Sequence, residues 1–64
     1  MSSDLQAKLE KYERKAAQYE KTAQQATSRA DRAFYQGLAS YCEDLAAKFR
    51  EVIAKRSDAS LAAE

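Results

Sequence analysis

The order of small and large apolar residues along this chain is the feature that most limits how it can fold. In both halves, apolar residues recur at steps of three and four, the spacing of one face of an α-helix. When the chain is folded back near Ser28, small residues of one half lie opposite large residues of the other. The expected layers pair Ala23 with Leu38, Tyr19 with Cys42, Ala16 with Leu45, Tyr12 with Phe49, and Leu9 with Val52. Because such alternation fills space at native density, the sequence predicts an all-α, antiparallel two-helix hairpin.

The same pattern predicts where the helices begin and end in this single domain of 64 residues. Ser28, followed three residues later by Asp31, is typical of an N-cap with an acidic first turn. We therefore expect helix one over 3–27, a bend over 28–30, helix two over 31–57 and a frayed tail over 58–64. One continuous helix of about 50 residues in an intermolecular coiled coil is the alternative, since periodicity alone does not exclude it.

The apolar face of the second predicted helix is wider than one neighbour requires. Its residues cover about 140 to 160° of the helical wheel, whereas a face packed on one neighbour needs only about 100°. A hairpin of this size is marginal alone, and with one cysteine and no histidine it has neither an internal disulfide nor a zinc site. We expect it to form a homodimeric four-helix bundle. The candidate interface consists of Tyr35, Leu38, Tyr41, Cys42, Leu45, Phe49 and Ile53.

Composition argues against most chemistry. There is no histidine for acid–base work at neutral pH, and Gly37 is the one glycine, so no glycine-rich phosphate loop exists. We expect no enzymatic activity, no catalytic residue, no cofactor and no metal. No apolar run approaches the roughly 20 residues that span a bilayer, and the N-terminus has no signal-peptide pattern. A cytoplasmic location, which suits a single unpaired thiol, is the expectation.

The function predicted from these features is that of a small protein-interaction module. It would serve as an adaptor, a regulator or an accessory subunit, acting through the apolar face of helix two. Its expected partners are a second copy of itself and a larger protein. A membrane-surface helical protein is a further alternative, because tyrosine and lysine suit the bilayer interface.

A basic edge on helix one leads to another alternative. Lys8, Lys11 and Lys15 lie beside the apolar face, although glutamates such as Glu10 and Glu13 interrupt the run. The layout of two helices of about 25 residues joined by a tight bend resembles the Rop-type helical hairpins. That resemblance implies a four-helix dimer that acts as an RNA-binding regulator. It covers the architecture and carries no RNA-contact residues to this chain.

Overall fold

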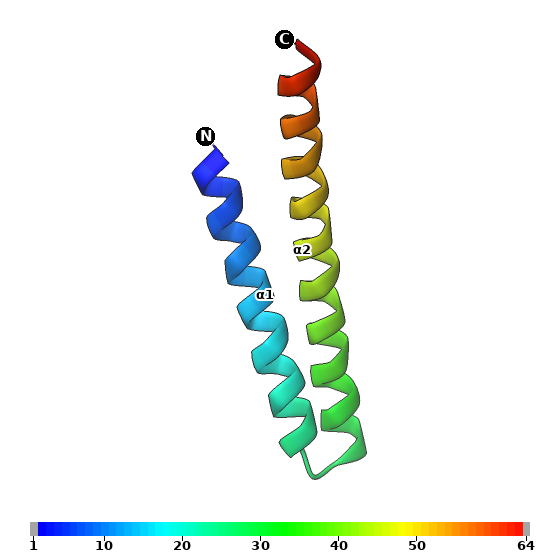
Figure 1. Ribbon diagram of the computed structural model, residues 1–64. Helices are drawn as coiled ribbons and strands as arrows, with labels where there is room; N and C mark the ends of the chain where they lie inside the picture. The colour runs from blue at the N-terminus through cyan, green and yellow to red at the C-terminus, as the bar shows by residue number, and fades with distance from the viewer. Residues whose placement is uncertain (1, 64) are drawn as a thin grey trace.

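The computed structural model consists of two α-helices that run antiparallel (Figure 1). It describes the backbone of residues 2–63 and the side chains of residues 4–56. Helix α1 spans Ser2–Gln25 and helix α2 spans Arg29–Ala63. The two helices lie side by side, and the ends of the chain lie at the same end of a rod of 55 × 15 × 11 Å. The predicted helical hairpin is confirmed, and the single continuous helix is wrong.

The bend lies at residues 26–28, two residues earlier than predicted, because Ser28 caps α2 directly. The Asp31 backbone N–H donates to Ser28 Oγ at 3.0 Å, and the Arg32 N–H donates to the Ser28 carbonyl at 3.1 Å. These bonds satisfy donors that have no partner within the first turn, so α2 begins at Arg29. On the other side of the bend, the Arg32 guanidinium donates to the Ala26 carbonyl at 3.3 Å.

The far end of α2 also differs from the prediction. The helix was expected to end near residue 57, yet it runs to Ala63. Residues 58–63 of the predicted frayed tail are therefore helical. Alanine and leucine are strong helix formers, and neither proline nor glycine follows Gly37 to end the helix. Glu64 lies outside the described residues.

Most of the buried residues in the contact between the helices, which we call the seam, are alanines. Among the described side chains, the buried residues are Leu9, Ala16 and Ala23 from α1, with Ala39, Cys42 and Ala46 from α2. Ala39 and Ala46 are 2% and 1% exposed, whereas Leu38 and Leu45 are only half-buried. The expectation that these leucines lie opposite the α1 alanines at the seam centre is therefore wrong by one residue. Small side chains on both helices take the centre, and the leucines lie at the edge.

Aromatic layers border the seam on one side. The Tyr12 and Phe49 rings stack with centroids 5.7 Å apart, as the folded-back pattern predicts. Tyr19 was expected to face Cys42, but its ring stacks on Tyr35 at 6.3 Å. Val52 was expected opposite Leu9 in the core, yet it is 41% exposed. These differences have the same origin as the leucine displacement, because α2 is turned so that Ala39 and Ala46 face α1.

The cap at Ser28 yields a first testable prediction. Ser28→Ala removes the oxygen that accepts the Asp31 N–H, and we expect the free energy of unfolding to fall by about 0.5–2 kcal/mol. Urea denaturation at one fixed protein concentration measures this change. Ser40→Ala is the control, because this exposed residue lies inside α2, where alanine is the better helix former. Equal losses in the two variants would show that the cap does not stabilise α2.

The alanine seam yields a second prediction. Ala46 is 1% exposed, so Ala46→Leu forces a large side chain into the buried seam. Overpacking of this kind costs about 1–3 kcal/mol. Ala47→Leu, at the exposed neighbouring position, should change the free energy of unfolding by no more than about 0.5 kcal/mol. Urea denaturation of both variants separates the effects. A stabilised Ala46→Leu variant would mean that the helices are not held together at this point.

Candidate interaction surface

The hairpin has two open sides, one on each side of the seam, and one of them is polar. Here Glu13 and Glu20 of α1 lie opposite Arg50 and Glu43 of α2. Arg50 Nη2 donates to Glu13 Oε2 at 3.2 Å, with both side chains about half exposed. An ion pair this exposed contributes about 0–1 kcal/mol. The pair therefore indicates how α1 is aligned against α2, but it adds little to the stability of the hairpin.

Shallow depressions follow the seam on this polar side. One is lined by Ala23, Ala39 and the polar groups of Glu20, Gln24, Gln36 and Ser40. A neighbouring one is lined by Ala16, Ala46, Glu13, Glu43 and Arg50. The small seam residues form the floor, since they do not reach far enough to fill the groove between the polar side chains. This side of the hairpin is open to solvent and carries charge close to the helix contact.

Two carboxyl groups meet across the polar side. The Glu20 carboxyl group raises the pKa of Glu43 above its ordinary value of 4.5, because it can accept a hydrogen bond from protonated Glu43 and because its charge repels that of ionised Glu43. Slight desolvation and the charge of Asp44 act in the same direction. Two carboxylates held this close disfavour each other's ionised form. The Glu20–Glu43 pair therefore opposes the hairpin when both groups are ionised.

The opposite side of the hairpin is apolar, and its largest feature is a row of residues on α2 that we call the α2 stripe. The stripe consists of Phe34, Leu38, Tyr41, Leu45 and Val52. Phe34 and Tyr41 are 61% and 63% exposed, Val52 is 41% exposed, and the two leucines are half-buried. The residues are spaced by alternating steps of four and three, with Lys48 at the position between Leu45 and Val52. This spacing is that of a coiled-coil seam. The described hairpin covers only the leucines in part and leaves Phe34, Tyr41 and Val52 exposed.

The structure distributes the predicted interface residues over three environments. Leu38, Tyr41 and Leu45 belong to the α2 stripe. Tyr35, Phe49 and Ile53 are half-buried, with the first two stacked on α1 tyrosines. Cys42 is 5% exposed and lies in the seam, as expected for a small core residue, so it is not part of the open surface.

Two members of the α2 stripe were missing from the predicted interface. Phe34 and Val52 were placed in the broad apolar face of helix two, but not in the candidate interface. Their spacing from Leu38 and Leu45, four residues before and seven after, was the signal that could have found them. The prediction centres the wide face on Leu38, Cys42, Leu45 and Phe49, whereas Cys42 lies in the seam.

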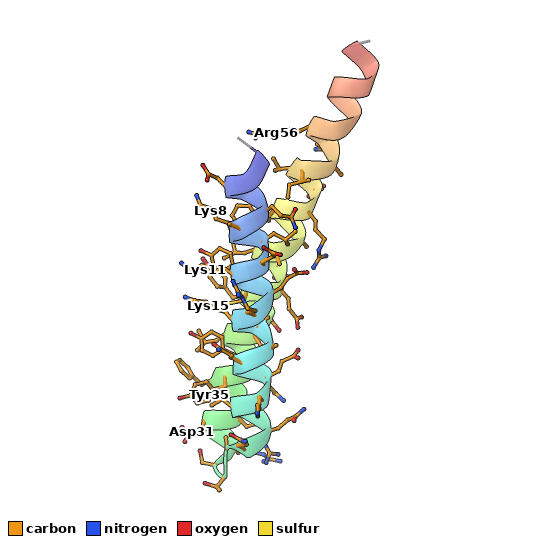
Figure 2. All side chains as sticks on the ribbon, turned by 60° about the vertical axis from the view of Figure 1, so that its left-hand side comes forward. Lys8, Lys11, Lys15, Asp31, Tyr35 and Arg56 are labelled. Atoms are coloured by element: carbon orange, nitrogen blue, oxygen red, sulfur yellow. The ribbon has the colours of Figure 1, made fainter. Side chains whose placement is uncertain are left out.

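The basic edge of α1 borders the apolar side. Figure 2 shows Lys8, Lys11 and Lys15 on the same side of the hairpin as Tyr35. Lys8 and Lys11 are exposed and Lys15 is half-buried. Among residues 4–56, the ion pair of the hairpin joins Arg50 and Glu13 and involves none of these lysines. The role of this edge in nucleic-acid binding stays a prediction.

No protein-family model matches the chain, and no curated protein or solved structure matches it either. Within the described residues, neither helix has an apolar stretch long enough to cross a bilayer. In the same part of the chain, no three side chains of histidine, cysteine, aspartate or glutamate are placed together to hold a metal ion.

The Glu20–Glu43 pair yields a prediction about pH. Because the pKa of Glu43 is raised in the folded hairpin, protonation of Glu43 favours the folded state at low pH. This stabilisation is lost as pH rises from 4.5 through the raised pKa. Glu43→Gln removes the repulsion, so we expect a higher melting temperature than wild type near neutral pH. The difference should shrink as both proteins are acidified. Thermal melts followed by circular dichroism between about pH 4 and pH 7 measure both effects.

Glu51→Gln is the matched control for this experiment. It removes the same charge from an exposed position of α2, two turns away from Glu43. Its melting temperature should not show the same dependence on pH. Equal behaviour of the two variants would contradict a specific contact between Glu20 and Glu43.

Proposed function

We propose that this protein is a small interaction module that acts as a homodimer, in which the α2 stripe of one copy packs on the α2 stripe of another. In that role it would serve as an adaptor, a regulator or an accessory subunit. The observation that carries the proposal is the uncovered coiled-coil repeat on α2, with Phe34 and Tyr41 more than half exposed. Aromatic residues in such a row are characteristic of the buried part of protein interfaces.

The incomplete core of the hairpin supports a second copy as the occupant of the α2 stripe. Among the described side chains, no large residue is fully buried, and four of the six buried residues are alanines. Alanine buries little apolar area, so the seam alone gives a domain of this size limited stability. A second hairpin placed on the stripe would finish the burial of Leu38 and Leu45, which α1 only half covers.

Geometry and charge support self-association as well. The stripe extends from Phe34 to Val52, about 27 Å along the helix, and its spacing allows identical helices to interlock their side chains. The net charge of the chain is +1, so two copies meet with little overall repulsion. The basic edge of α1 would remain open in the dimer for contact with a larger partner.

Self-association makes a prediction for Tyr41, which is 63% exposed in the hairpin. Tyr41→Asp places a charge in the proposed interface without removing a residue from the seam. We expect the variant to keep its helical circular dichroism spectrum at low temperature and to sediment as a monomer at roughly micromolar concentration, where the wild type sediments as a dimer. Ala47→Asp adds the same charge at an exposed position away from the stripe and should leave the dimer intact.

Three results would contradict the proposal. One is a wild-type protein that is folded and monomeric up to about millimolar concentration. Another is a Tyr41→Asp variant that dimerises as tightly as the wild type. The third is a dimer that Ala47→Asp disrupts as strongly as Tyr41→Asp, which would place the interface elsewhere on the hairpin.

A further inference from the structure

We infer that the two copies pair their α2 helices antiparallel, so that Asp31 of each copy meets Lys55 of the other. This inference rests on the proposed self-association through the α2 stripe. It goes further by specifying the orientation of the second copy and the charged residues that select it.

The repeat of the α2 stripe continues beyond its apolar residues at both ends. Asp31 lies three residues before Phe34, and Lys55 lies three residues after Val52, so both fall on the same row. Both side chains are exposed. Figure 2 shows Asp31 on the same side of the hairpin as Tyr35. The row therefore begins with an acid and ends with a base, and it carries Lys48 between its apolar members.

A parallel pair of α2 helices would place every residue of the row opposite its own copy. Asp31 would face Asp31, Lys48 would face Lys48, and Lys55 would face Lys55. Like charges brought together at an interface oppose association. The charged residues of the row therefore act against the parallel orientation, in which all three of these layers are repulsive.

An antiparallel pair removes the three repulsive layers. In antiparallel coiled coils, successive layers combine residues from opposite ends of the repeat. The layers pair Asp31 with Lys55, Phe34 with Val52, Leu38 with Lys48, and Tyr41 with Leu45, each occurring twice by symmetry. Unlike charges then meet at both ends of the interface.

The apolar layers also fit the antiparallel orientation. The large ring of Phe34 lies over the small side chain of Val52, which packs more evenly than two phenylalanines facing each other. Lys48 covers Leu38 with its aliphatic part and extends its ammonium group to water. On its own helix, Lys48 is also one turn from Asp44 and Glu51, which are favourable neighbours for its charge.

The antiparallel dimer predicts distances that spectroscopy can measure. Its two-fold axis passes near residue 43, midway between Tyr41 and Leu45. Ala33 lies ten residues from that axis, so its two copies are about 30 Å apart along the helices. Asp44 lies one residue from the axis, so its two copies are close together.

Spin labels on single cysteines, introduced by Ala33→Cys or Asp44→Cys in a Cys42→Ala background, test the orientation by pulsed electron resonance. Sedimentation first shows whether the background variant still dimerises. We expect about 30 Å or more between labels at 33 and less than about 20 Å between labels at 44. Short distances at both positions would overturn the antiparallel orientation. The absence of a dimer in the unlabelled wild type would instead overturn the proposed self-association.

Charge exchange provides an independent test that needs no label. In the antiparallel dimer, Lys55→Asp places two acids in each end layer, and we expect the dimer to weaken roughly three- to tenfold. Adding Asp31→Lys restores opposite charges in both layers and should recover most of the loss. In a parallel dimer, Lys55→Asp only exchanges one like-charge pair for another. Unchanged dissociation constants in sedimentation equilibrium for both variants would therefore overturn the inference.

Discussion

The close contact between two alanine faces is the constraint on which the rest of this hairpin depends. Ala16 and Ala23 of α1 meet a surface of α2 centred on Ala39 and Ala46, and all four are nearly inaccessible to solvent. Side chains this short leave no room for a leucine at the centre of the seam, because interiors are packed densely. The larger apolar residues of α2 are consequently displaced to the edge of the contact. The uncovered α2 stripe is thus a direct result of how the two helices hold each other.

The displacement gives the two open sides of the hairpin different physical roles. On the polar side, the Glu20–Glu43 pair keeps charge next to the seam, where a covering protein surface would have to desolvate it at a cost. On the apolar side, Tyr41 and its neighbours leave large hydrophobic groups in water, and covering them is favourable. Covering the apolar side would therefore lower the free energy and covering the polar side would raise it, which supports the α2 stripe as the proposed place of association.

Much of this arrangement could be predicted from the sequence. The hairpin, the cap at Ser28 and the Tyr12–Phe49 layer follow from helical periodicity and from local hydrogen bonding, both of which depend on near neighbours in the chain. The rotation of α2 by one residue, which replaces Leu45 with Ala46 at the seam, could not be predicted in the same way. A broad apolar face is compatible with several rotations, and the choice depends on how closely the helix axes approach. That distance is a property of the packed pair, and Val52 was misplaced for the same reason.

Stability and association are coupled in such a hairpin because the same leucines serve both. Leu38 and Leu45 are half covered by α1, and the half that remains is the part that a second copy would bury. Any occupant that binds only the folded hairpin shifts the folding equilibrium toward the folded state by mass action. An alanine seam that is weak in isolation would then become sufficient, since the proposed dimer would supply the missing apolar burial. The charged ends of the row would add little energy to the proposed dimer, but they would distinguish one orientation from the other. Hydrophobic burial would thus determine whether two copies associate, and Asp31 and Lys55 would determine how.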